Sequence, residues 1–275
     1  MTRLRVWRKE RLGELKILLD EINDRVEIPE YIQLDPVQFM HLFQRKQDAE
    51  IAGFLGALMA WGRRDIVISK GMDLMERMEF HPFEFVMNYR AGDRYAFEGF
   101  RHRTLKPVDL HGLILTLQSI YLEYPDFEGF WADCRDKGAF SGKGMMQEFY
   151  EQFTGRHEEF QRRTRKHIAN AGTGSTCKRL YMYLRWCCRQ NSPVDPGIWT
   201  FLKPAELMVP FDVHVARISR RYGLLSRRSN DMKAVQELTG RLKEMDSADP
   251  VRYDYALFAL GALNETLPSR FILNR

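Results

Sequence analysis

The chain has 275 residues, 44% of them hydrophobic, which is enough to bury a core as one large domain or as two lobes. The 42 Lys and Arg residues exceed the 37 Asp and Glu residues and give a net charge of +5. No stretch approaches the length of a membrane span, and the N-terminus lacks the apolar core of a signal peptide. The 4 cysteines show neither Cys-x-x-Cys nor Cys/His ligand spacing, which argues against a metal site. We therefore expect a cytoplasmic protein that needs no metal and no cofactor.

The predicted elements of the N-terminal half are helices. Near the N-terminus four apolar side chains recur at helical spacing: Leu15, Leu18, Leu19 and Ile22. Asp35-Pro36 combines a capping carboxylate with a proline suited to the first helical position, so it predicts the start of a short helix. Residues 48–61 are apolar on nearly all sides, which indicates a buried central helix. An amphipathic helix is expected from Ile66 to Met78.

The rest of the chain continues this pattern. Residues 88–106 show no clean period and are predicted to be a loop, and a long helix is expected from Pro107. Residues 136–145, rich in Gly and polar side chains, are predicted to be a flexible connection before a helix at 146–153. Two more helices are expected, from Asp231 to Met245 and from Asp249 to Leu263. With no alternating run that indicates a strand, the sequence predicts an all-α fold of roughly ten helices.

Positive charge is concentrated in residues 161–179, which hold six Lys or Arg and no acid. Such a run favours an anionic partner, nucleic acid before membrane, because no apolar anchor accompanies it. The alternative is an ordinary solvated basic face.

The segment at about 167–225 brings two chemically active side chains to helix starts. Lys178 follows the Gly- and Ser-bearing turn 172–175 and opens one helix. Asp212 follows Val209-Pro210-Phe211, which the proline keeps extended, and stands at the N-cap of the next helix. An amine and a carboxylate so placed can act as a nucleophile and its activating partner. The alternative is a surface lysine and a helix cap.

The stretch VPFDVHVARISRRYGLL resembles the catalytic-aspartate segment of the helix-hairpin-helix (HhH-GPD) DNA glycosylases, nearest the archaeal 8-oxoguanine branch. The resemblance implies a single all-α, two-lobed domain over residues 1–275 with a central cleft. Lys178, as a Schiff-base nucleophile, and Asp212, as its carboxylate, are expected to line this cleft within several ångströms of each other. The turn departs from the usual Leu-Pro-Gly-Val-Gly-x-Lys hairpin, since it reads Ala-Gly-Thr-Gly-Ser-Thr-Cys-Lys. The chain also resembles a bacterial family catalogued only as a domain of unknown function.

The same resemblance implies the remaining site residues. Asp254 and Phe258 lie four positions apart, so they share a helix face where oxidised-guanine glycosylases place a polar reader and an aromatic stacker. The alternative is a polar–aromatic pair on an ordinary amphipathic helix. The groups expected to hold DNA phosphates are Gly172, Gly174, Ser175, Arg179, His214 and Arg217.

We therefore expect a monomeric DNA glycosylase with β-lyase activity that removes an oxidised purine such as 8-oxoguanine from double-stranded DNA during base excision repair. A carboxylate near the sugar stabilises the positive charge that develops when the glycosidic bond breaks. A non-catalytic nucleic-acid-binding protein on the same scaffold is the first alternative. A glycosylase for another damaged base, or a related activity on RNA, is the second.

Overall fold

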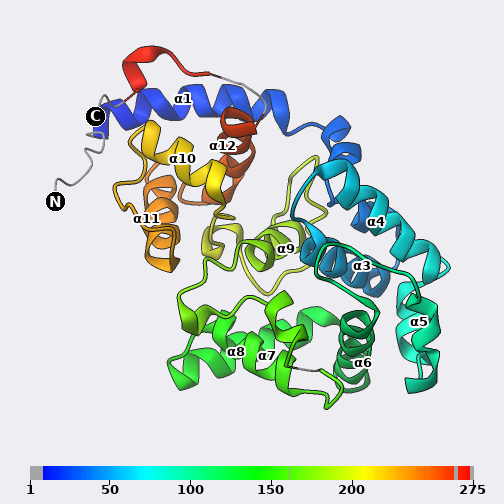
Figure 1. Cartoon of the computed structure of the whole chain (residues 1–275). Helices are drawn as coiled ribbons and strands as arrows, with labels where there is room; N and C mark the ends of the chain where they lie inside the picture. Colours follow the sequence, from blue (N-terminus) through cyan, green and yellow to red (C-terminus); the bar gives the residue numbers. More distant parts are fainter. Residues whose placement is uncertain (1–8, 161, 263–265, 273–275) are drawn as a thin grey trace. The chain divides into compact units, whose positions relative to one another are not determined.

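A computed structural model describes residues 9–160, 162–262 and 266–272, and these residues form an all-α structure without strands (Figure 1). The predicted fold class is confirmed. His102 and Leu105 form one isolated bridge. The α-helices of the described residues are α1 (Lys9–Val26), α2 (Gln38–His41), α3 (Lys46–Met59), α4 (Arg64–Arg77), α5 (Pro82–Asn88), α6 (Pro107–Glu123), α7 (Phe127–Ser141), α8 (Met145–Gly155), α9 (Lys178–Cys188), α10 (Val213–Arg221), α11 (Met232–Lys243) and α12 (Tyr253–Ala262). Short 3-10 turns lie at Pro29–Leu34, Ala91–Phe97, Thr164–His167, Ala171–Thr173, Pro204–Glu206, Pro250–Arg252 and Ser269–Phe271.

The chain folds into two compact units. The first comprises Met1–Tyr31 and Gly174–Arg275, and the second comprises Ile32–Thr173. The N-terminal helix therefore belongs with the C-terminal helices, which we call the terminal unit, and the intervening residues form the central unit. The boundary at 173/174 falls inside the turn that precedes Lys178.

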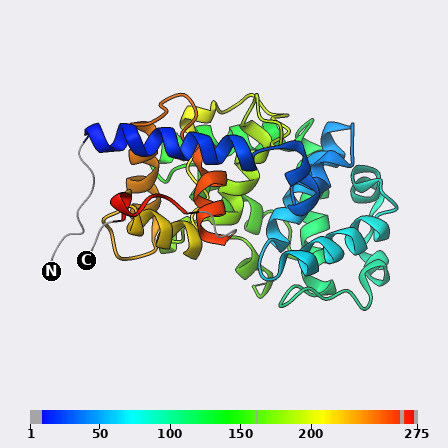
Figure 2. The same cartoon turned by 90° about the horizontal axis from the view of Figure 1, so that it is seen from above.

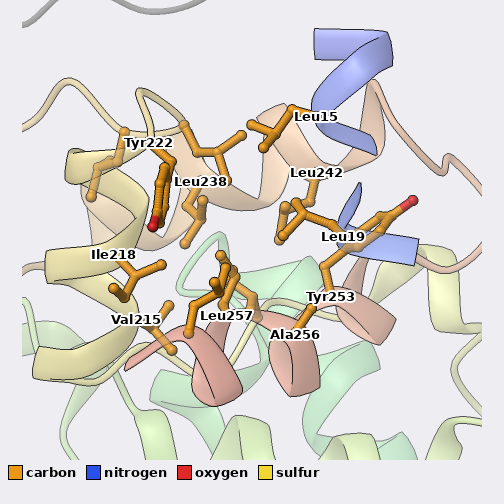
Figure 3. Packing of buried hydrophobic residues seen from close by; sticks show 14 of the residues in the cluster. Leu15, Leu19, Val215, Ile218, Tyr222, Leu238, Leu242, Tyr253, Ala256 and Leu257 are labelled. Carbon is orange, nitrogen blue, oxygen red and sulfur yellow. The ribbon is translucent and has the colours of Figure 1, made fainter. Parts of the chain in front are cut away.

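The terminal unit is built around α12, which packs against both α1 and α10 (Figure 2). Three of the four apolar side chains predicted to form the N-terminal stripe are fully buried, and Leu18 is half-buried. Side chains from α1, α10, α11 and α12 converge on one hydrophobic cluster (Figure 3). Burial of several large apolar side chains, each contributing about 1.5–3 kcal/mol, holds these sequence-distant helices together. The position of Asp212 depends on this core, because Val209, Phe211 and Val215 on either side of it belong to the cluster.

The central unit has an aromatic core. Helix α3 is buried over almost its whole length, as its apolar composition predicts. The rings of Trp131 on α7 and Phe149 on α8 stack with their centroids 3.8 Å apart, and α7 and α8 run side by side (Figure 1). The carboxylate of Glu50, fully buried on α3, accepts hydrogen bonds from Tyr121 Oη and the backbone amide of Phe127, each at 3.0 Å. Two donors thus satisfy a buried acceptor that would otherwise destabilise the core.

The prediction of a flexible connection at 136–145 is wrong. Helix α7 runs to Ser141, and the actual connection is the short stretch 142–144. A Cβ on Gly138 would lie 2.6 Å from the carbonyl carbon of Gly144, so glycine allows a close approach of backbone here. The glycine that suggested a loop is therefore a packing residue inside a helix.

Three smaller differences concern helix boundaries. Asp35 does not cap a helix at Pro36: its Oδ1 accepts from the amide of Val37 at 3.1 Å, and α2 begins only at Gln38. The predicted loop at 88–106 contains the 3-10 turn at 91–97. The helix expected from Asp249 begins as a 3-10 turn and continues as α12, while its expected last residue, Leu263, lies outside the described residues. The helices expected at 66–78, from Pro107, at 146–153 and from Asp231 are confirmed within two residues at their starts.

Candidate active site in the terminal unit

Lys178 and Asp212 lie together in the terminal unit. Lys178 is the first residue of α9, and Asp212 is the N-cap of α10. Their side chains approach with Nζ 3.5 Å from Oδ2, and they are 32% and 17% exposed. The proximity expected from the sequence is confirmed, and both groups remain accessible to a ligand.

The two oxygens of Asp212 face different partners. Oδ1 accepts hydrogen bonds from the amides of His214 and Val215, each at 2.8 Å, which is the predicted N-cap. Oδ2 faces the amine of Lys178. Since α10 directs its first amides at Oδ1, the cap fixes the orientation of the carboxylate and so aims Oδ2 at the lysine. Capping and a chemical role are therefore compatible in the same residue.

The turn before Lys178 is tight. Gly174 adopts φ +80°, a conformation that favours glycine, and its carbonyl accepts from the amide of Met232 at 3.3 Å. Cys177 is also left-handed, at φ 49°. Burial raises the pKa of the Cys177 thiol to about 11, so this cysteine stays protonated and is a poor nucleophile. Of the two side chains at the start of α9, the amine of Lys178 is the one suited to attack.

Asp254 joins this pair from α12. Its carboxylate receives a hydrogen bond from Arg185 of α9, and its side chain is 13% exposed. Burial raises the pKa of Asp254 to about 7; Arg185 opposes the shift, the charge of Asp212 adds to it, and Lys178 opposes it. The charges of Lys178 and Asp212 thus act directly on Asp254, and three of the predicted site residues form one electrostatic unit.

Phe258 lies one turn beyond Asp254. Between Tyr253 and Leu260 these two side chains alone are half-buried, whereas the other six are buried. They share a face of α12, as their spacing predicts. This arrangement leaves one partly accessible polar–aromatic strip on a helix that is otherwise buried from Tyr253 to Leu260.

The predicted phosphate-binding groups have different surroundings. Gly172 belongs to the central unit, and its amide donates to Gln147 Oε1 at 2.5 Å and to Asn170 Oδ1 at 2.9 Å, so it is already engaged. Ser175 is half-buried, and its Oγ accepts from the amide of Cys177 at 3.3 Å. Around Gly174 an added Cβ would meet nothing within 4 Å, so this backbone stays open to approach.

The three basic residues of that set also differ. Arg179 is half-buried, and burial lowers the pKa of its guanidinium. His214 is exposed on the first turn of α10. Arg217 is exposed, but its Nη2 donates to the carbonyl of Gly261 at 2.8 Å and so caps the end of α12. Of the three, His214 presents its side chain most openly.

A buried ion-pair network, which the sequence did not predict, supports the site. Arg185 approaches Asp195 at 3.3 Å, and Tyr255 Oη donates to the same carboxylate at 2.7 Å. Asp195 also pairs with Arg189 at 3.0 Å. Arg189 binds Glu27 of the segment after α1 through both terminal nitrogens. The network ties the segment after α1 to α9 and α12. The one sequence signal was the i, i+4 spacing of Arg185, which lies in the buried part of α9, and Arg189, the C-cap of that helix.

Asp254 is expected to give the protein a pH-dependent stability. Its pKa in the folded protein, about 7, exceeds the ordinary value of 3.8, so the folded state binds this proton more tightly than the unfolded chain. The resulting stabilisation is complete below about pH 4 and is lost as the pH rises to about 7. Asp254→Asn should therefore flatten the decline in the urea midpoint between about pH 5 and about pH 8.

Asp231→Asn provides the control for that measurement. A hydrogen bond from Arg227 holds the pKa of Asp231 at about 2, so this carboxylate stays ionised in both states over the measured range. An identical pH dependence in Asp254→Asn and the parent protein would contradict the proton assigned to Asp254.

The comparisons with known proteins place the chain in a family. The chain belongs to the family described as "Protein of unknown function (DUF2400)", which matches residues 35–263. That span contains Lys178, Asp212, Asp254 and Phe258 and begins after α1. Neither the curated proteins nor the solved structures include a significant match.

Metal-holding and membrane-crossing features do not occur in the described part of the chain. Within residues 9–160, 162–262 and 266–272, no group of three or more His, Cys, Asp or Glu side chains is arranged to hold a metal ion. Over the same residues, no helix combines the length and the apolar character needed to cross a bilayer.

Proposed function

We propose that the terminal unit carries the active site of a DNA glycosylase with β-lyase activity on an oxidised purine. The observation that carries the proposal is the 3.5 Å approach of Lys178 Nζ to the one oxygen of Asp212 that does not cap α10. The resemblance of the Asp212 segment to helix-hairpin-helix glycosylases supplies the reaction class. Asp254 and Phe258 supply a polar group and an aromatic ring that can recognise the damaged base.

The proposed reaction gives chemical roles to Lys178, Asp212 and Asp254. The neutral amine of Lys178 attacks C1′ of the damaged nucleoside, the glycosidic bond breaks, and the base leaves with the bonding electrons. Asp212 stabilises the positive charge on the sugar and accepts the proton that the amine loses. The C1′–O4′ bond then breaks as the nitrogen lone pair forms the C=N bond of the Schiff base, and O4′ takes back the proton held by Asp212. Loss of a proton from C2′ to solvent then expels the 3′ phosphate by β-elimination. A hydrogen bond from Asp254 in its protonated form stabilises the departing base.

Covalent trapping tests this proposal. Lys178 should form a borohydride-stable adduct with a duplex that contains 8-oxoguanine, and it should form none with an undamaged duplex. Adducts with another damaged base but not with 8-oxoguanine would keep the reaction class and change the substrate.

A non-catalytic nucleic-acid-binding protein is the second candidate. The engaged amide of Gly172 favours it, because the hairpin of a glycosylase needs amides that can reach a phosphate. In that case Lys178 and Asp212 would form only an ion pair. Duplex binding without any trapped adduct would distinguish this candidate from the enzyme.

Both candidates require DNA binding through the basic residues of the segment 161–179. Two arginines of this segment are the best targets for substitution. Arg162 and Arg165 are exposed, whereas Arg163 donates to Asp109 at 2.9 Å, and Asp109 is fully buried. Arg163 should be left in place, because its removal would leave a buried carboxylate short of a partner. Replacement of Arg162 and Arg165 by Gln should lower the slope of log affinity against log salt by about 0.9 for each phosphate that the protein no longer neutralises.

The matched control for the salt measurement is Arg135→Gln. Arg135 is a half-buried arginine on α7 of the same unit, with 39% of its side chain exposed, and it pairs with Asp136 at 2.9 Å. The variant Arg135→Gln should leave the slope of log affinity against log salt unchanged. No duplex binding by the parent protein at low salt would contradict both candidate functions.

A further inference from the structure

The terminal unit contains a polar cavity that the proposed reaction does not use. Its volume is about 560 Å³, and its walls come from the end of α1, the segment after α9 and the segment before α12. Its charged lining consists of four carboxylates and two guanidiniums: Asp24, Glu27, Asp246, Asp249, Arg189 and Arg252. Two negative charges in the lining are therefore left without a positive counterpart, although the whole chain is basic.

Both arginines already face carboxylates, so neither can offset the two remaining negative charges. Arg189 is committed to Glu27, to Asp249 at 2.7 Å and to Asp195, which lies outside the cavity. Arg252 is held loosely, with its nitrogens 3.5 Å or more from each carboxylate that it faces. Burial, reinforced by the charge of Glu27, raises the pKa of Asp249 although Arg189 opposes the shift. The lining as a whole therefore carries more carboxylates than guanidiniums to balance them.

An asparagine supplies a second, independent observation. Asn23 lines the cavity and is 1% exposed. Its Nδ2 donates to Glu27 Oε2 at 2.6 Å, but its Oδ1 accepts no hydrogen bond from the described part of the chain. Oδ1 of Asp249 likewise accepts no hydrogen bond from the described part of the chain. Buried acceptors without donors are costly, so both oxygens favour a ligand that donates hydrogen bonds.

We propose that this cavity binds an organic cation that carries primary ammonium groups, such as a polyamine. An ammonium group offers three donors and a positive charge, and these match the unpartnered acceptors and the excess of carboxylates. An anion is disfavoured by the charge of the lining. A bare metal ion is disfavoured because the volume exceeds what an ion needs and no metal-holding cluster occurs among the described residues.

Calorimetric titration of the full chain with spermidine tests the proposal. The parent protein should bind spermidine saturably with a stoichiometry of one at low ionic strength. Asn23→Leu removes the buried acceptor, and Asp246→Asn removes one charge while keeping the oxygen that accepts from the amides of Ala248 and Asp249. Each variant should weaken spermidine binding by about tenfold or more.

Glu244→Gln is the matched control. Glu244 pairs with Arg241 at the end of α11, is 50% exposed and does not line the cavity, so its loss should leave spermidine binding unchanged. If Asn23→Leu fails to fold, Asp246→Asn alone decides. Absence of saturable binding, an equal loss in Glu244→Gln, or binding of Mg²⁺ in place of spermidine would overturn the proposal. The titration contains no DNA, so its result is independent of glycosylase activity.

Discussion

Replacement of Asp212 by asparagine is expected to slow base excision by about 100-fold or more. The change removes the negative charge that faces both Lys178 and the developing cation on the sugar. Asparagine keeps an oxygen that can accept from His214 and Val215, so the free energy of unfolding should fall by less than about 1 kcal/mol. Single-turnover excision on an 8-oxoguanine duplex and thermal unfolding measure the two effects separately.

Asp231→Asn is the control for this variant. Asp231 caps α11 as Asp212 caps α10, with Oδ1 accepting from the amide of Ala234 at 3.1 Å, but its charged neighbour is Arg227 rather than a lysine. Excision by Asp231→Asn should match the parent protein. Unchanged excision by Asp212→Asn would reduce Asp212 to a helix cap and remove the proposed mechanism.

Replacement of Lys178 by glutamine is expected to abolish the borohydride-trapped adduct and the β-elimination that cuts the strand. Both steps need a Schiff base, and an amide side chain cannot form one. Slow excision by water can survive, because Asp212 still stabilises the developing charge. Denaturing gels of the product strand, with and without alkaline cleavage, separate excision from strand cutting.

Lys233→Gln is the matched control for Lys178. Lys233 is an exposed lysine in the first turn of α11, so it tests whether any lysine near a helix start in the terminal unit is trapped. It should retain the full adduct. Full strand cutting by Lys178→Gln would assign the nucleophile to another residue.

The sequence predicted the local signals well. The N-cap at Asp212, the helix start at Asp231 and the buried helix at 48–61 all depend on short-range chemistry, and all three are confirmed. Gly138 was misread because its role is not local. Position 138 requires glycine because a Cβ there would collide with the backbone of Gly144, and no local sequence pattern displays this packing constraint.

The candidate site could be predicted only in part, because contacts between residues far apart in the sequence leave no local pattern. The proximity of Lys178 and Asp212 came from a resemblance, not from periodicity, because 34 positions separate them. The pairing of Arg185 with Asp254 joins residues 69 positions apart and depends on the packing of α9 with α12. Burial of Asp254 in the folded protein raises the pKa of its carboxyl, so only the structure could reveal this shift.

Mapping the covalent adduct tests the central claim most directly. The parent protein is incubated with an 8-oxoguanine duplex and borohydride, digested, and analysed by mass spectrometry for the peptide that carries the reduced sugar. We expect a modified peptide that contains Lys178, together with loss of the adduct when Asp212 is replaced by asparagine. An adduct on a different lysine, or no adduct despite tight duplex binding, would contradict the proposed mechanism.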